Sequence, residues 1–210
     1  MILHGYWRSG TSYRLRIALN AKGLAFEQVT HDLRLGEQRE DKYRTLNPQG
    51  LVPALEADGE VLTQSSAIIE WLDECYPDPP LLPANARDRA VVRAMALLVA
   101  CDIHPLNNLR VLNRLRTDLG ADKAAVNAWI GHWISEGFAA LEAMIVRHGG
   151  RYCFGDSLTL ADCHVVPQVY SAERFAVPLD AFPRLVETVA RLRENPAVVA
   201  AHPDLQPDAG

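Results

Sequence analysis

The chain has 210 residues, of which 49% are hydrophobic and 22% charged, and its net charge is −5. These values are ordinary for a globular protein of one or two domains. The negative charge and the lack of a basic stripe argue against nucleic acid as a partner. No signal-peptide pattern opens the sequence, and no apolar run reaches the roughly 18 residues of a membrane span. We therefore expect a cytoplasmic protein without a membrane partner.

The first predicted elements are a strand over residues 2–7 and a helix that starts near Gly10. Ser9, Thr11 and Ser12 place three hydroxyl groups at the junction. The free N–H groups of a helix N-terminus favour an anion, and such surroundings lower the pKa of a thiol. The junction therefore predicts a thiolate site, and because no cysteine lies nearby, the sulfur would arrive on a ligand. The alternative is a capped helix that binds no ligand.

A second group of signals lies further along the chain. The sequence from Asn47 to Gly50 is typical of a turn and precedes an apolar strand that contains Pro53. The Val52–Pro53 bond is open to both isomers. Residues 61–63 predict another strand, and the helix after it carries Ser65 and Ser66 in its first turn. This helix start predicts a second anion site, one suited to a carboxylate.

A proline-rich stretch from Tyr76 to Asn85 divides the chain. Its prolines cannot continue a helix, and they stiffen a linker. Strands and helices alternate before this stretch, whereas only helices are predicted after it. We therefore predict an α/β domain over residues 1–78, a linker over residues 79–85 and an all-helical domain over residues 86–210.

The second half of the chain is predicted to consist of helices. Apolar positions recur at helical spacing over residues 86–117, 122–147 and 183–194, and a further helix is expected after Pro196. Thr159 and Asp162 have the spacing of a capping box, which is a structural motif. We expect residues 206–210 to be frayed.

The four cysteines are Cys75, Cys101, Cys153 and Cys163. None has C-x-x-C spacing, so the sequence predicts neither a zinc site nor a disulfide framework. We expect each cysteine to be a small buried hydrophobic residue. No other cluster indicates a metal site.

The order of elements in the first half resembles the thioredoxin-like half of the cytosolic glutathione transferases. Arg8-Ser9, followed by Arg14-Leu15-Arg16-Ile17-Ala18, is similar to the zeta class, which includes maleylacetoacetate and maleylpyruvate isomerases. The second half is similar to that class at residues 101–112, 155–162, 166–169 and 172–175. The resemblance implies a thioredoxin-like glutathione-binding domain, a helical domain that contributes the second-substrate site, and a homodimer.

The resemblance also implies roles for residues around glutathione. Ser9 stands where the zeta-class motif carries its thiolate-stabilising serine, and Thr11 stands where many relatives have a cysteine. Because threonine cannot form a mixed disulfide, side chemistry that depends on that cysteine should be absent. The rest of glutathione would be held by Gln49, Val52, Gln64 and Ser65, of which the last two would bind the γ-glutamyl carboxylate.

The second half supplies further candidates. His104 and Asn108 are four residues apart, which predicts that they share one helix face with Cys101. The resemblance implies that this face lies toward the bound ligands, with His104 and Asn108 near glutathione. The alternative is a packed or solvated histidine.

Three arginines are candidates for the substrate site: Arg8, Arg110 and Arg174. The planar guanidinium group forms paired, charge-assisted hydrogen bonds with a carboxylate. Because Arg8 adjoins Ser9, we also expect it to meet charge that develops near the sulfur. For Arg110 and Arg174 the alternative is a solvated surface arginine.

The resemblance, together with these residues, implies a glutathione-dependent cis–trans isomerase of aromatic catabolism. Its substrate would be maleylacetoacetate or maleylpyruvate, and its product the fumaryl isomer, formed by reversible addition of the glutathione thiolate. One alternative is a zeta-like glutathione transferase or dehalogenase that acts on α-haloacids. Another is a noncatalytic glutathione-binding interaction module, against which Ser9, Gln64 and Ser65 argue.

Overall fold

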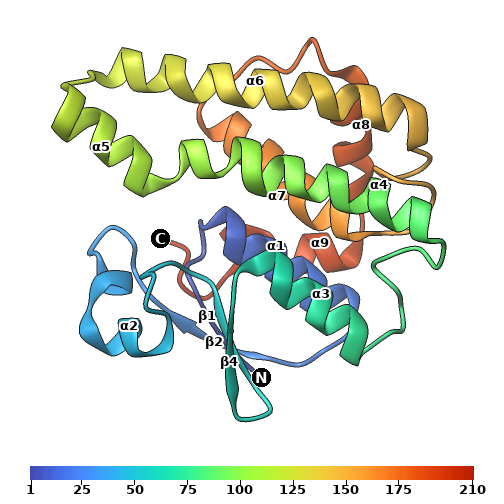
Figure 1. Ribbon diagram of the computed structural model, residues 1–210, viewed down its shortest axis with the longest axis horizontal. Helices are drawn as coiled ribbons and strands as arrows, with labels where there is room; N and C mark the ends of the chain where they lie inside the picture. Colours follow the sequence, from blue (N-terminus) through green and yellow to red (C-terminus); the bar gives the residue numbers. More distant parts are fainter. The chain divides into compact units, whose positions relative to one another are not determined.

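A computed structural model describes residues 1–210 and divides the chain into two compact units (Figure 1). The first unit contains residues 1–81 and 193–210, and the second contains residues 82–192. The predicted helical domain includes residues 193–210, and the structure corrects this. The reason is that helix α9 (Pro196–Ala200) packs against helix α1 (Gly10–Ala21), and the side chains of Asn20 and Arg16 donate to backbone carbonyls of this segment.

The first unit is built on a four-stranded sheet in the order β2-β1-β3-β4. The strands are β1 (Ile2–Gly5), β2 (Glu27–Thr30), β3 (Ala54–Ala57) and β4 (Glu60–Thr63). Strand β1 pairs in parallel with β2 and antiparallel with β3, which in turn pairs antiparallel with β4. The parallel pair requires a crossover, and α1 supplies it. The N-terminus of α1 therefore lies at the end of β1.

Two further α-helices and a short 3-10 turn belong to this unit. Helix α2 (Asp41–Leu46) follows a short 3-10 turn at Glu37–Arg39, and helix α3 (Ser65–Cys75) follows β4 and packs against α1. The buried face of α3 presents Ile68, Ile69 and Leu72, which are spaced as one helical stripe. The predicted order of strands and helices is confirmed, and the Val52–Pro53 bond is cis.

The second unit is helical. Its helices are α4 (Ala86–Leu97), α5 (Leu109–Leu119), α6 (Lys123–His148), α7 (Leu160–Arg174) and α8 (Pro183–Leu192). Helix α4 packs against α7, and α6 packs against α8. One long helix was expected over residues 86–117, but the structure breaks it into α4, a π-helical turn at Leu98–Ile103, a 3-10 turn at Pro105–Asn107 and α5. The reason is Pro105, which has no N–H group and cannot continue an α-helix.

The run Ala86–Leu119 is long and apolar enough, by length and composition alone, to cross a membrane. However, it is interrupted at Pro105, and its fully buried positions, Val92, Met95, Val99 and Ile103, belong to the core of the second unit. It also carries charged residues at Arg87, Asp88, Arg89 and Arg93. We therefore interpret this run as core structure of a globular unit.

Two expectations about individual residues are wrong. Residues 206–210 are not frayed, because Gln206 is buried and donates to the carbonyls of Ala200 and His202. Cys153 and Cys163 are buried as expected, whereas Cys75 and Cys101 are exposed. The exposed pair shows that apolar character alone does not place a cysteine in the core.

The predicted capping box at the start of α7 is present. The carboxylate of Asp162 is fully buried and accepts from the Thr159 N–H at 2.7 Å, the Thr159 hydroxyl at 2.8 Å and the Cys153 N–H at 2.9 Å. Burial raises the pKa of this carboxyl, although all these donors oppose the shift. Asp162 therefore ties the α7 start to the loop before it.

We expect Asp162→Asn to lower the free energy of unfolding by about 2 kcal/mol, because the new amide NH₂ group would face a buried N–H donor. Chemical denaturation would measure the loss. Asp156→Asn is the matched control, since Asp156 accepts from a backbone N–H of the same loop, that of Arg151, but is exposed. Equal stability of the two variants would contradict the assigned role of Asp162.

Candidate active site

Ser9 is the N-cap of α1. Its backbone is extended, and its side-chain oxygen accepts from the Ser12 N–H at 3.2 Å. Helix α1 starts at Gly10, so the N–H groups of Gly10 and Thr11 have no partner within the helix. The half-buried Ser9 side chain thus stands beside free backbone donors and the positive end of a helix dipole. This arrangement can hold an anion.

Thr11 connects Ser9 to the loop before β3. The Thr11 hydroxyl donates to the Val52 carbonyl at 2.9 Å, and its oxygen lies 2.9 Å from the Ser9 hydroxyl. Because the single Thr11 proton is used for Val52, the Ser9 hydroxyl is the donor to Thr11. The structure therefore brings three predicted residues together, with Ser9 aligned by Thr11 and the Val52 N–H left without a hydrogen bond.

The loop that carries Gln49 and Val52 is fixed by buried side chains. Asn47 donates to the Leu51 carbonyl and accepts from the Gln49 N–H, and the Tyr43 hydroxyl also donates to the Leu51 carbonyl at 2.7 Å. Burial raises the pKa of Tyr43 to about 12, so this hydroxyl stays protonated. Gly50 has φ +62°, and a Cβ there would meet the Gln38 carbonyl at 2.9 Å. The loop is therefore a rigid platform.

Gln64 and Ser65 lie at the start of α3. The Gln64 side chain donates to the Gln49 side chain at 2.7 Å, which brings two predicted ligand residues into contact. Gln64 has φ +70°, a left-handed conformation that is uncommon for a residue other than glycine. Such strain is concentrated at functional sites. Ser65 is buried, and its hydroxyl accepts from the guanidinium of buried Arg14 at 3.4 Å.

Arg8 is held over an aromatic ring. Its guanidinium carbon lies 5.1 Å from the centre of the Trp7 ring, which packs against Tyr6, Tyr43 and Val52. A guanidinium group over a ring face is attracted by the ring's quadrupole. Arg8 therefore presents its charge one residue before Ser9 on an ordered support.

His104 and Asn108 do not share a helix face. His104 follows the π-helical turn, whereas Asn108 has extended backbone and is the N-cap of α5, where its side chain accepts from the Arg110 N–H at 3.1 Å. The expectation of one continuous helix face is wrong because Pro105 redirects the chain between the two residues. Asn108 has a capping role in addition to any contact with a ligand.

The two candidate arginines of the second unit, Arg110 and Arg174, are both exposed. Arg174 is the last residue of α7, and its guanidinium carbon lies 5.9 Å from the centre of the Tyr170 ring and 5.3 Å from that of Phe175. Arg110 lies in the first turn of α5. Arg174 therefore has an aromatic cradle that restricts its side chain.

Comparison with known proteins identifies the family. The family model of the glutathione S-transferase N-terminal domain matches residues 8–75, and that of the C-terminal domain matches residues 116–201. The chain belongs to the glutathione S-transferase family. It is 54% identical, over the full length of both chains, to a maleylpyruvate isomerase from Ralstonia sp. It is also 51% identical to the maleylacetoacetate isomerase of Pseudomonas aeruginosa, over 99% of this chain and 98% of that protein.

Solved structures agree with these relatives. A maleylpyruvate isomerase described as a bacterial glutathione S-transferase of the zeta class superposes with a TM-score of 0.98 at 53% identity, with both chains fully covered. A maleylacetoacetate isomerase from Methylobacterium extorquens AM1, with malonate and glutathione bound, superposes with a TM-score of 0.96 at 37% identity, again over both full chains. The predicted fold and the predicted zeta-class membership of this glutathione S-transferase are confirmed.

Several supporting residues of the site were missed in the sequence analysis. Tyr43 and Asn47 fix the loop at Leu51, and Arg14 contacts Ser65. Asn47 stands at the first position of a turn and could have been recognised there, since asparagine side chains bond their own backbone two residues on. Arg14 left a weaker signal, a charge between the apolar residues Tyr13 and Leu15. No feature of the sequence alone indicates the role of Tyr43.

We expect Ser65→Ala, and separately Gln64→Asn, to weaken glutathione binding about tenfold, the effect of losing one or two hydrogen bonds to a carboxylate. Asparagine is chosen for residue 64 because it tolerates a positive φ. Turnover at saturating glutathione should change less, because these residues would bind a part of the tripeptide that does not react. Calorimetric titration measures the affinity, and Ser157→Ala, at an exposed serine of the second unit, is the control. Unchanged affinity in both variants would show that the γ-glutamyl carboxylate binds elsewhere.

Proposed function

We propose that this chain catalyses cis–trans isomerisation with Ser9 and the α1 N-terminus holding the glutathione sulfur as a thiolate. The chain is a glutathione-dependent isomerase that converts a maleyl diketo acid, of the maleylacetoacetate or maleylpyruvate type, into its fumaryl isomer. This reaction places it in aromatic catabolism. The observation that carries the proposal is the hydrogen-bonded group of Ser9, Thr11 and Val52 at a helix N-terminus.

The residues present fit glutathione. The N–H groups of Gly10 and Thr11 follow Ser9 at the helix start, and Val52, whose own N–H makes no hydrogen bond, is linked to Ser9 through Thr11. Such donors suit an anionic sulfur with a peptide attached. The Gln49–Gln64 pair and Ser65 offer further polar groups. When bound, glutathione supplies a thiolate that adds reversibly to the maleyl double bond, so that rotation about the resulting single bond is possible before the sulfur leaves unchanged.

Ser9 would act on the sulfur at both ends of the cycle. Its hydroxyl donates to Thr11 in the structure, and rotation would redirect this proton to a bound sulfur. Lowering the thiol pKa by about two units corresponds to roughly 2.7 kcal/mol of preferential thiolate stabilisation. The Ser9 hydroxyl, the free N–H groups and the helix dipole together can supply a stabilisation of this size.

Cationic side chains would bind the substrate and stabilise charge that develops on it. Arg8 or His104 would stabilise the negative charge that develops on the ketone oxygen of the substrate. Arg174, with Arg110 as the next candidate, would bind a substrate carboxylate through the planar fork of its guanidinium. His104 and Asn108 would also contact glutathione. Since the relative from Methylobacterium extorquens binds malonate together with glutathione, a dicarboxylate fits this family of sites.

The proposal extends to assembly and location. We propose a homodimer, as the fold family implies, and a cytoplasmic location. The domain roles follow the family: residues 1–78 would bind glutathione and the helices after residue 86 would contribute the second-substrate site.

The test is to follow loss of the maleyl chromophore with each of the two substrates, with and without glutathione, and to identify the products. The fumaryl isomer should form only when glutathione is present, and glutathione should be recovered unchanged. Recovery of a stable glutathione conjugate would instead indicate a transferase. Absence of reaction with both substrates, in protein that binds glutathione, would contradict the isomerase assignment.

A further inference from the structure

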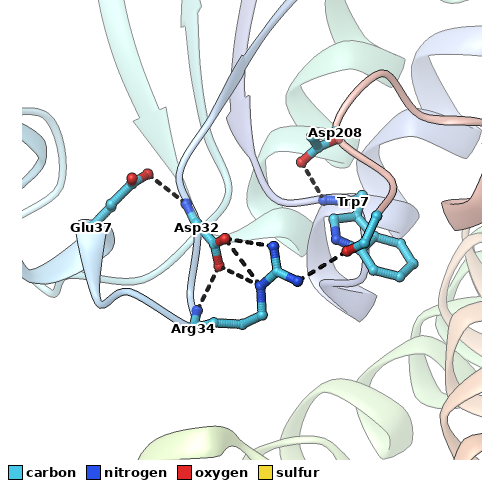
Figure 2. A network of polar contacts seen from close by, with 6 residues as sticks. Trp7, Asp32, Arg34, Glu37 and Asp208 are labelled. Atoms are coloured by element: carbon cyan, nitrogen blue, oxygen red, sulfur yellow. Dashed lines mark hydrogen bonds and ion pairs between the residues drawn. The ribbon is translucent and has the colours of Figure 1, made fainter.

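Residues 206–210 lie against the turn that carries Arg8 and Ser9. The Asp208 carboxylate accepts from the Trp7 backbone N–H at 2.9 Å, although the two residues are 201 positions apart in the sequence (Figure 2). Asp208 itself is half-buried. Both residues belong to the first unit, so this contact lies within one compact body.

The segment around Asp208 is held on both sides. Before it, buried Gln206 donates to the carbonyls of Ala200 and His202 and accepts from the Gln28 side chain. After it, Arg34 donates to the Gly210 oxygen at 2.9 Å. The Asp208 carboxylate is therefore fixed in place by contacts on either side rather than by its own hydrogen bond alone.

Arg34 is itself anchored. Its guanidinium forms paired hydrogen bonds with the Asp32 carboxylate at 2.8–3.1 Å, and the Asp32 N–H donates to Glu37 at 2.6 Å (Figure 2). The Arg34 guanidinium lowers the pKa of Asp32 from its ordinary value, so this pair stays charged near neutral pH. A charged, paired contact of this kind supplies geometric specificity.

Trp7 is the point at which these contacts reach the site. Its N–H donates to Asp208, and its carbonyl accepts from buried Arg16 at 2.8 Å, so both of its backbone polar groups are fixed. Its ring carries the Arg8 guanidinium. Ser9, two residues after Trp7, donates its N–H to the Tyr6 carbonyl at 3.0 Å. Trp7 therefore sets the position of the residues on either side of it.

We propose that Asp208 is a positioning residue that fixes the Trp7 backbone and thereby aligns Ser9 and Arg8 for the reaction. The inference rests on the proposed function of these two residues. Asp208 touches neither glutathione nor substrate in this role. Because small displacements of catalytic groups reduce rates strongly, loss of this contact should lower turnover without removing the groups that bind the peptide.

The variants are Asp208→Ala, which removes the acceptor, and Asp208→Asn, which keeps an acceptor oxygen of the same size. Asp204→Ala is the matched control, because Asp204 lies in the same segment and is exposed. Three measurements apply to each variant: steady-state kinetics, titration of the bound glutathione thiol by its ultraviolet thiolate absorbance, and hydrogen–deuterium exchange of the backbone around Trp7 in protein without glutathione.

We expect Asp208→Ala to lower kcat about tenfold, with the affinity for glutathione changed less than twofold. In the same variant the pKa of the bound thiol should rise, and hydrogen–deuterium exchange near Trp7 should accelerate. Asp208→Asn should restore most of each property. Asp204→Ala should match the wild type. Unchanged kcat and thiol pKa in Asp208→Ala, or an Asp208→Asn variant as impaired as Asp208→Ala, would overturn the proposal. If the isomerase assignment itself fails, wild-type turnover is absent, whereas the thiol titration and the exchange still test Asp208.

Discussion

Replacing Ser9 by alanine should lower turnover by about a hundredfold, which is the typical cost of removing one hydrogen-bond donor that stabilises developing or transferred charge. Glutathione affinity should change much less, because the tripeptide would be held through Gln49, Val52, Gln64 and Ser65. The pKa of the bound thiol should rise, since the hydroxyl favours the thiolate over the thiol. Loss of the maleyl chromophore measures turnover, and ultraviolet titration of the bound thiol measures the pKa.

The structure adds a second consequence for this variant. Because Ser9 also caps α1, Ser9→Ala should lower the free energy of unfolding by about 1 kcal/mol. Kinetics must therefore be measured well below the melting temperature of the variant. A folded Ser9→Ala protein with wild-type turnover would remove Ser9 from the mechanism.

Thr11 provides the comparison for Ser9. Thr11→Ser keeps the hydroxyl that donates to Val52 and accepts from Ser9, so it should be close to the wild type. Thr11→Ala removes both hydrogen bonds and should lower turnover, but by less than Ser9→Ala. A larger effect of Thr11→Ala would mean that the two roles have been exchanged.

Local signals predicted much of the fold. A hydroxyl residue before a helix, as at Ser9, and the pair of Thr159 and Asp162 act through the backbone within three residues of themselves, so the sequence contains the whole motif. The alternation of strands and helices in the first unit was readable for the same reason. The resemblance to a family then supplied roles that no local pattern contains.

Contacts between distant parts of the chain were not predictable. Asp208 is hydrogen-bonded to Trp7, and Gln206 to Gln28, only because residues 193–210 return to the first unit. The small and polar composition of residues 206–210 is typical of a frayed end, and no other feature of the sequence argues against that prediction. Tertiary hydrogen bonds order the segment instead.

The region around His104 shows a different limit. A four-residue spacing places two side chains on one face only if the helix is regular between them. A proline such as Pro105 cannot continue a helix, but the structure that replaces the helix here, a π-helical turn followed by a 3-10 turn, depends on packing against α6. The candidate residues were therefore identified without their true arrangement.

Replacing Arg174 by methionine should raise the Michaelis constant for the maleyl substrate far more than that for glutathione. Loss of a charge-assisted, paired contact with a carboxylate costs about 1.5 to 3 kcal/mol, which is roughly ten- to more than a hundredfold in kcat/KM. Methionine preserves much of the apolar stem that lies against Tyr170 and Phe175. The variant should therefore fold normally, and steady-state kinetics with each substrate varied in turn would measure the effect.

Arg151→Met is the matched control for this substitution. Arg151 is also exposed in the second unit, and its guanidinium carbon also lies over a tyrosine ring, 5.5 Å from the centre of Tyr152. A general loss of positive charge would affect both variants, whereas loss of a carboxylate site would affect Arg174→Met alone. Arg8→Met should differ from both, because it removes the cation that would stabilise charge developing near the sulfur. Turnover should therefore fall more than the Michaelis constant rises. If Arg174→Met behaves as the wild type does, the carboxylate binds elsewhere and Arg110 becomes the residue to replace next.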